Sequence, residues 1–199
     1  FNKEFIKNNL KKKKIKIDFF KKDYLNVISI GRLTNQKDHL TILKAIENLK
    51  SDFRIRLIIM GKGTNKFLLQ EYINNKNLKN KVKLIGYKKN PYPYIQRSDI
   101  VLLSSKYEGL PNILLEGQFL KKYIISTNCP TGPKEILLNG KAGDLVKISD
   151  YKRIAELISS YYKNKKRINK MIKTGTDNFY RFDYSVNCLK YLNFVSRNF

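Results

Sequence analysis

The residues with the most evident chemical potential are two glutamates, Glu108 and Glu116, on either side of the sequence Gly-Leu-Pro at positions 109–111. A carboxylate can accept two hydroxyl donors at once, which is the arrangement that a ribose or pyranose diol offers. Pro111 is typical of the first turn of a helix, where its missing N–H costs nothing. The backbone N–H groups of Gly109, Leu110 and Asn112 would meet at that helix start, where partial positive charge favours a phosphate. The stretch therefore predicts a phosphate site flanked by two sugar-binding carboxylates.

An apolar run of strand length, Ile100–Leu103, comes directly before this stretch. The loop therefore lies at the carboxyl end of a strand, which is the edge where open α/β sheets bind ligands. Five further runs are expected to form strands, at 26–30, 54–60, 82–85, 123–126 and 143–146. Because helical segments alternate with these runs, the sequence predicts an α/β fold, a doubly wound parallel sheet of about six strands.

The segments between the strands predict the helices, at 34–49, 64–77, a short stretch ending near 98, 111–120, a short stretch from 132, and two or three helices after 150. Residues 1–25 are expected to be a basic lead-in, densest at Lys11–Lys14. Residues 26–181 would form the α/β domain. Residues 182–199 would form a C-terminal helix, with Leu189, Leu192 and Val195 on an apolar stripe.

The chain is strongly basic, with 41 Lys and Arg against 16 Asp and Glu among 199 residues and a net charge of +25. Such a charge favours anionic partners in general. The interpretation we prefer is a solvated, lysine-rich surface, followed by contact with an anionic membrane face, and nucleic acid binding comes last. Two cysteines, Cys129 and Cys188, form no Cys-x-x-Cys motif. Few cysteines predict a reducing setting, and no apolar run reaches the roughly 18 residues that span a bilayer.

Several short motifs occur in one order between residues 26 and 150. They are Gly31-Arg32-Leu33 with Gln36-Lys37-Asp38, Gly61-Lys62-Gly63, Val82 to Gly86, Asp99 to Ser104, Glu108-Gly109-Leu110-Pro111 with Glu116, Ser126-Thr127, and Gly132-Pro133-Lys134-Glu135-Ile136. In this order they resemble the C-terminal, donor-binding half of the retaining glycosyltransferases of family 4, which have the two-domain GT-B fold. The segment from Cys129 to Glu135 is similar to bacterial members that add hexoses or N-acetylhexosamines to lipid-linked or surface glycans.

The resemblance implies catalytic roles for Arg32, Lys37 and Glu108 and a donor-binding role for Glu116. Arg32 and Lys37 would neutralise the diphosphate of a nucleotide sugar, expected to be UDP-linked, while Glu116 would bind its ribose and Glu108 its sugar. The other implied donor-binding residues are Gly31, Gly61, Gly63, Ile85, Tyr87, Gly109, Leu110 and Pro111. No metal or cofactor is expected, because no two aspartates stand two residues apart and fixed cations can stabilise a diphosphate leaving group instead.

The resemblance also implies partners and a location. A GT-B enzyme reacts between two domains, and a first strand at residue 26 leaves the N-terminal acceptor domain absent from this chain. The isolated chain is therefore expected to bind a nucleotide sugar but to transfer little of it. The acceptor would be a surface or lipid-linked glycan. We expect a cytoplasmic protein, with peripheral contact to the anionic inner face of the membrane left open.

Two other functions fit parts of the sequence. The positive charge would suit a basic nucleic-acid-binding module, whose affinity would collapse with salt, although the resemblance implies no nucleic acid partner. A nucleotide-sugar epimerase of the GT-B type would bind the same donor but would need an acid–base histidine, and His39 is the single histidine in the sequence. Taken alone, Lys37 can be one surface lysine among many, and Gly61-Lys62-Gly63 can be a plain turn.

Overall fold

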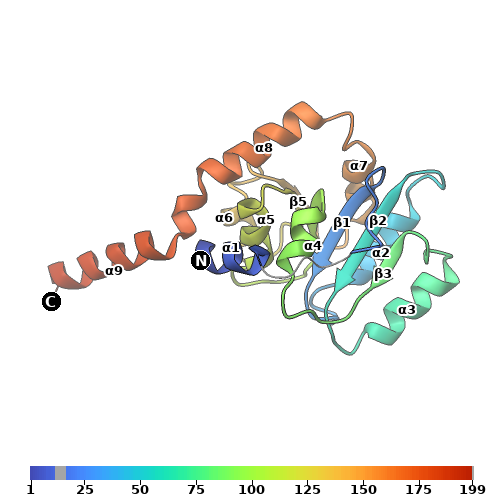
Figure 1. The fold of residues 1–199 in the computed structure, drawn as a ribbon, viewed down its shortest axis with the longest axis horizontal. Coiled ribbons are helices and arrows are strands. Elements are labelled where there is room, and N and C mark those ends of the chain that lie inside the picture. The colour runs from blue at the N-terminus through green and yellow to red at the C-terminus, as the bar shows by residue number, and fades with distance from the viewer. Residues whose placement is uncertain (12–16, 199) are drawn as a thin grey trace.

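The computed structural model describes residues 1–11 and 17–198, which are built around one parallel sheet (Figure 1). The sheet has six strands in the order β3-β2-β1-β4-β5-β6, and every neighbouring pair is parallel. The strands are β1 Leu25–Ile30, β2 Ile55–Met60, β3 Val82–Leu84, β4 Ile100–Leu103, β5 Tyr123–Thr127 and β6 Asp144–Val146. The predicted α/β class and the number of strands are confirmed.

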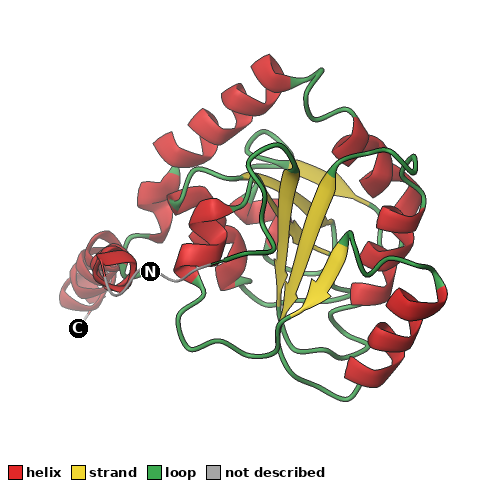
Figure 2. Ribbon diagram, turned by 45° about the vertical axis from the view of Figure 1, so that its right-hand side comes forward, coloured by secondary structure: helices red, strands yellow, loops and turns green. Residues whose placement is uncertain are grey.

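Helices cover both faces of this sheet (Figure 2). They are α1 Lys3–Lys11, α2 His39–Glu47, α3 Lys66–Asn75, α4 Tyr92–Arg97, α5 Asn112–Phe119, α6 Pro133–Ile136, α7 Tyr151–Ser159, α8 Lys165–Asp177, the 3-10 helix η1 Phe179–Phe182, and α9 Tyr184–Asn198. Apolar residues of α2, α3 and α7 form one core cluster with the sheet, and those of α1, α4 and α5 form the other.

The strands alternate between these two clusters because successive side chains of a strand point to opposite faces. Val27 of β1 belongs to the first cluster and its neighbour Ile28 to the second, and Ile100 and Val101 of β4 divide in the same way. All four side chains are fully buried. Burial on both faces explains why the strands are uninterrupted apolar runs in the sequence.

The strand order places a ligand crevice between β1 and β4. The chain moves outward from β1 through β2 to β3, and then returns to lay β4 on the other side of β1. The helices that follow β1 and β4 therefore lie on opposite faces of the sheet, and the loops before them diverge at the carboxyl ends of these strands. This is the switch point at which doubly wound sheets bind ligands.

The helix predicted from Thr34 begins five residues later, at His39, and that part of the prediction is wrong. Residues 34–38 form turns, and Asp38 has a left-handed φ of 45°. The physical reason is a contact from β4's loop, because the Ser104 hydroxyl bonds to the carbonyl oxygens of Lys37, at 2.8 Å, and Asp38, at 2.9 Å. The Lys37 carbonyl is thus bound across the crevice, and the Asp38 carbonyl is shared between Ser104 and the Thr41 amide of α2, at 3.1 Å.

The two ends of the described chain differ in how they pack. In the expected lead-in, Ile6 of α1 is buried, and Lys3 forms an ion pair of 2.7 Å with Asp183. The α9 helix projects away from the sheet (Figure 1), and Leu189 and Leu192 are 61% and 60% exposed. Most of the dense lysine run, from residue 12 to 14, lies outside the described residues. The proposed domain boundaries stay a prediction.

Candidate functional site

The loops that follow β1 and β4 are joined directly by hydrogen bonds. The Lys106 amide donates to the Gln36 carbonyl at 2.8 Å, and the Gln36 side-chain amide donates to the Tyr107 carbonyl at 3.0 Å. The Arg32 guanidinium donates to the Gln36 side-chain oxygen at 3.2 Å. Residues that are about 70 positions apart in the sequence thus form one wall at the carboxyl edge of the sheet.

Lys37 and Glu108 form an ion pair within this wall. The Lys37 Nζ donates to the Glu108 Oε1, and the two side chains are only 15% and 8% exposed. The Ser105 hydroxyl donates to the same oxygen at 2.5 Å. Two of the three residues for which the family resemblance implies catalytic roles are therefore in direct contact, and the pair is largely shielded from solvent.

A cavity of about 530 Å³ opens at the β1–β4 switch point. The sequence-predicted residues that line it are Gly31, Arg32, Lys37, Gly61, Tyr87, Pro111 and Glu116. Both predicted cationic side chains and the predicted carboxylate Glu116 thus face a single space. Pro111 also lines it, and it caps the start of α5, so the positive end of that helix dipole borders the cavity.

Glu116 is the carboxylate of this cavity and comes from the second turn of α5. Burial raises the pKa of its side chain from the ordinary value of 4.5 to about 7. Tyr92 of α4 lines the same cavity, and its pKa is raised by burial first and then by the Glu116 charge. Glu116 is therefore partly protonated near neutral pH and can donate or accept a hydrogen bond there.

Five predicted residues do not line this cavity, namely Gly63, Ile85, Glu108, Gly109 and Leu110. Of these, Glu108 lies one residue away from the cavity, because it forms an ion pair with Lys37, which lines it. Leu110 is half exposed on the loop before α5, and the Ile85 amide continues the β2–β3 ladder by donating to the Ile59 carbonyl.

The glycines of the loop after β2 allow close backbone contact with the loop after β1. A Cβ on Gly61 would lie 1.8 Å from the Gly31 carbonyl oxygen, and one on Gly63 would lie 2.4 Å from the Leu33 carbonyl oxygen. The Leu33 amide donates to the Lys62 carbonyl at 3.0 Å. These glycines therefore bring the Lys62 loop against the cavity wall, which a plain turn would not require.

Several lining residues have no role in the sequence-based prediction. They are Ile30, Met60, Lys62, Lys88, Lys89, Pro91, Tyr92, Asn112 and Ile113. The two lysines at 88 and 89 follow the end of the third strand, so their position at the carboxyl edge of a parallel sheet could have been inferred from the sequence. Tyr92 gave no such signal, because it begins a helix that packs on the face of the sheet.

His39 lies outside this cavity. It is buried at the start of α2, and its Nδ1 has no hydrogen-bond partner among the described residues. Burial, followed by the nearby charge of Lys37, lowers the pKa of the imidazole to about 4. His39 is therefore neutral at pH 7 and packs in the core, and it does not supply the acid–base group that an epimerase would need.

The described residues were considered for a metal site and for a membrane span because the sequence predicts neither. Within them, no three His, Cys, Asp or Glu side chains gather closely enough to hold a metal ion. None of the helices in the same part of the chain combines the length and the apolar character needed to cross a bilayer.

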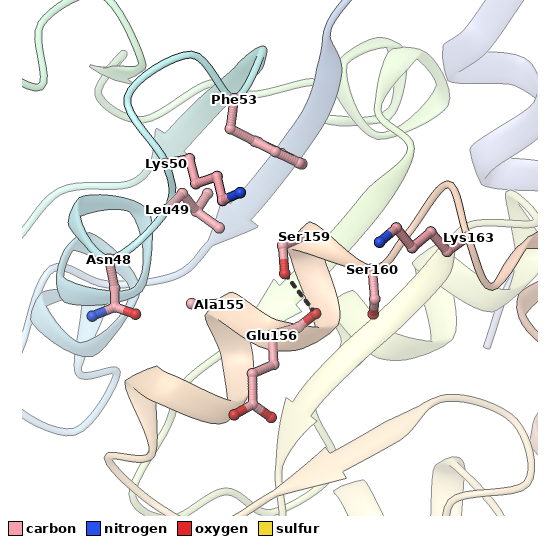
Figure 3. Close-up of a pocket in the computed structure, with 9 residues that line it drawn as sticks. All are labelled: Asn48, Leu49, Lys50, Phe53, Ala155, Glu156, Ser159, Ser160 and Lys163. Atoms are coloured by element: carbon pink, nitrogen blue, oxygen red, sulfur yellow. Dashed lines mark hydrogen bonds between the residues drawn. The ribbon is translucent and has the colours of Figure 1, made fainter.

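A second cavity, of about 440 Å³, lies at the opposite edge of the sheet (Figure 3). Lys50 and Phe53 precede β2, while Ser159, Ser160 and Lys163 lie at and beyond the end of α7. Figure 3 shows the side chains of Lys50 and Lys163 extending toward each other, with Ser159 and Ser160 below them in this view. None of the residues predicted to act on a donor reaches this cavity.

Known sequences resemble this chain over most of its length. The family model "Glycosyl transferases group 1" matches residues 11–178. An uncharacterized glycosyltransferase of Methanocaldococcus jannaschii is 43% identical over 117 residues, which are 58% of this chain and 29% of that protein. The N-acetylgalactosamine-N,N'-diacetylbacillosaminyl-diphospho-undecaprenol 4-alpha-N-acetylgalactosaminyltransferase of Campylobacter jejuni is 28% identical over 169 residues, 83% of this chain and 46% of that protein. The chain thus spans less than half the length of these two relatives.

Solved structures share the same fold. Anabaena HepE in complex with UDP superposes with a TM-score of 0.79 at 18% identity, over 87% of this chain and 49% of that one. A glycosyltransferase from Rickettsia africae superposes with a TM-score of 0.80 at 20% identity, over 98% of this chain and 52% of that one. At these identities the likeness establishes the architecture of the sheet and its helices.

Proposed function

Because the chain belongs to the glycosyl transferases group 1 family, we propose that it is the donor-binding half of a retaining hexosyltransferase. It binds a nucleotide sugar, UDP-linked, at the carboxyl edge of the sheet. The protein of which it is the donor half transfers a hexose or N-acetylhexosamine to a surface or lipid-linked glycan. The retaining stereochemistry rests on the resemblance of the motifs around Glu108 and Glu116 to family 4.

The observation that carries this proposal is the cavity that Arg32, Lys37 and Glu116 share. A departing nucleoside diphosphate gains negative charge in the transition state, and two fixed cations at the cavity wall would stabilise it without a metal. Glu116 would accept hydrogen bonds from the ribose hydroxyls. Glu108, held beside Lys37, would bind the hydroxyls of the donor sugar next to the diphosphate.

The ligands and activities of related proteins support the choice of ligand classes. HepE has been crystallised with UDP and with UDP-glucose. The Campylobacter relative is named for transfer of N-acetylgalactosamine to a diphospho-undecaprenol glycan, and a Staphylococcus aureus relative is a poly(ribitol-phosphate) alpha-N-acetylglucosaminyltransferase. A UDP-linked sugar and a glycan acceptor are therefore the first ligands to test with this chain.

The acceptor site belongs, in this proposal, to a second domain on the N-terminal side, for which the greater length of the relatives leaves room. The cleft between the two domains would then be closed over the Arg32 and Glu116 cavity. The cytoplasmic location and the contact with an anionic membrane face remain part of the proposal. They would bring the donor site near a lipid-linked acceptor.

Calorimetry tests the nucleotide site. UDP, GDP, ADP and their sugars are titrated into the chain, into Glu116→Ala and into Glu71→Ala, which removes a surface glutamate of α3 as a matched control. We expect one nucleotide class to bind and Glu116→Ala to weaken it by about 1.5 to 3 kcal/mol, the range for a hydrogen bond to a charged group. The control should bind like the unchanged chain.

Two results would contradict the proposal. If the unchanged chain bound no nucleoside diphosphate at concentrations up to several millimolar, the donor-site assignment would fail. If Glu116→Ala bound as tightly as Glu71→Ala, a nucleotide site could stand, but the role of Glu116 at the ribose would be wrong.

A further inference from the structure

Glu108 is held asymmetrically, with its two carboxylate oxygens in different situations. Its Oε1 accepts hydrogen bonds from the Lys37 ammonium and from the Ser105 hydroxyl. Within residues 1–11 and 17–198, no donor to its Oε2 is found, although the side chain is only 8% exposed. One oxygen is thus fixed and the other remains available to a ligand.

The main chain of Glu108 is fixed as well. Its amide donates to the Pro130 carbonyl at 2.7 Å, and its carbonyl accepts from the Thr131 amide at 2.7 Å. With the backbone bound in both directions, only the side-chain torsions of Glu108 are left to vary. The contacts from Lys37 and Ser105 therefore decide where the free oxygen lies.

Ser105 is itself held by the sheet. Its side chain is fully buried, and its carbonyl accepts a 2.6 Å hydrogen bond from the Thr127 hydroxyl, which is also fully buried. Thr127 ends β5, and Ser105 lies two residues beyond the end of β4, the strand that pairs with β5. A continuous path of hydrogen bonds thus runs from the rigid sheet to Glu108.

We propose that Ser105 and Thr127 are positioning residues that set Glu108 for the donor sugar. The inference rests on the proposed function and goes beyond it. Once a diphosphate occupies the cavity, the Lys37 ammonium must serve the phosphate oxygens, and its hold on Glu108 weakens. The Ser105 hydroxyl lies outside the cavity lining and keeps its bond to Oε1, so the free oxygen of Glu108 stays directed to the sugar hydroxyls.

The ratio of two affinities isolates this role. UDP lacks the sugar, so UDP affinity reports the cavity alone, whereas the gain on adding the sugar reports Glu108. The probe is whichever of UDP-glucose and UDP-N-acetylgalactosamine the unchanged chain binds more tightly. We expect Ser105→Ala to lower affinity for that sugar nucleotide about tenfold, as loss of a hydrogen bond to a charged group does, and to leave UDP affinity within about twofold.

A matched control is Ser98→Ala. Ser98 is also buried, and its hydroxyl bonds at 2.8 Å to the Ile95 carbonyl in α4, so this variant loses a buried serine hydroxyl remote from Glu108. It should keep both affinities. At Thr127, the variant Thr127→Val removes the hydroxyl at constant shape and should lower the affinity ratio, whereas Thr127→Ser keeps the hydroxyl and should restore it.

The outcomes separate this inference from the proposed function. An unchanged chain that binds no UDP overturns the proposed function and the inference with it. A chain that binds UDP but gains nothing from the sugar, or a Ser105→Ala variant with an unchanged affinity ratio, overturns the inference and leaves the nucleotide site intact. Equal loss of UDP and sugar-nucleotide affinity would assign Ser105 a purely structural role and also overturn the inference.

Discussion

At the scale of single residues, Glu116 combines two properties that seldom occur together in a carboxylate. It is largely buried, which raises its pKa to about 7, and it still borders a cavity that is lined by cationic side chains. Burial disfavours the charged form because a low-dielectric surrounding solvates a carboxylate poorly. A ribose that donates two hydroxyls to this carboxylate would restore the missing solvation, so binding and ionisation of Glu116 should be coupled.

The raised pKa predicts how stability changes with pH. Between the ordinary value of 4.5 and about 7, the folded chain holds a proton on Glu116 that the unfolded chain has released. The contribution of Glu116 to stability is therefore fully present below pH 4.5 and is lost as pH rises through 7, by up to about 3 kcal/mol. Glu116→Gln stays neutral, so its unfolding free energy should rise relative to the unchanged chain between about pH 5 and pH 8.

Urea denaturation of both proteins at these two pH values measures the difference. Glu71→Gln, at an exposed position of α3, serves as the control and should show no pH-dependent gain. A Glu116→Gln variant that followed the unchanged chain at both pH values would show that burial does not raise the pKa of Glu116 in solution.

At the scale of elements, the strands were predictable and their connections were less so. Burial on both faces makes β1 and β4 continuous apolar runs, which a sequence displays directly. The turn at residues 34–38 escaped because its conformation depends on the Ser104 hydroxyl, which is more than 60 residues away in the chain. A local sequence pattern cannot predict a contact between residues so far apart in the chain.

The candidate site divides along the same line. The resemblance of the surrounding motifs grouped Arg32, Lys37 and Glu116 at one donor site, and the structure has all three at one cavity. Their functional roles stay predictions. The contact of Lys37 with Glu108 and the support from Ser105 could not be foreseen, because they depend on how two loops with different side chains settle against each other.

Gly132 offers a test of how the elements around Glu108 fit together. It has a φ of 77°, and a Cβ there would lie 2.0 Å from the Gly109 carbonyl oxygen and 2.8 Å from the Pro111 Cδ. Gly132→Ala should therefore lower the free energy of unfolding by about 3 kcal/mol, because the new side chain adds left-handed backbone strain and overpacks the contact. It should also displace the 109–111 loop and weaken sugar-nucleotide binding. Thermal and urea denaturation with calorimetry measure these losses.

Gly140 supplies the matched comparison. Its φ of 89° is similarly left-handed, but the nearest atom to an added Cβ is 3.9 Å away. Gly140→Ala should cost only the backbone strain, about 1 to 2 kcal/mol, and should leave ligand binding unchanged. Equal destabilisation by the two substitutions would mean that the contact between Gly132 and the 109–111 loop is not tight in solution.

At the scale of the whole molecule, the net charge of +25 raises the question of what the positive surface attracts. The cavity alone gathers Arg32, Lys37, Lys62, Lys88 and Lys89 around the carboxylate of Glu116. A diphosphate can contact only a few of these cationic side chains. The others would raise the association rate of an anionic ligand more than they would raise its affinity. Charge of this kind belongs to the surface and does not by itself identify a polynucleotide partner.

The salt dependence of binding separates a nucleotide site from a nucleic-acid surface. A UDP ligand presents two or three charges to a partly enclosed site, so its affinity should fall less than about tenfold between 50 and 200 mM salt. A surface that contacts many phosphates of a duplex would lose about a thousandfold over the same range. We therefore expect UDP binding to persist at the higher salt, and a 20-base-pair duplex not to displace UDP there. Calorimetry at both concentrations decides the matter, since displacement of UDP by the duplex at 200 mM would place a polynucleotide at the Arg32 cavity and remove the case for a sugar donor.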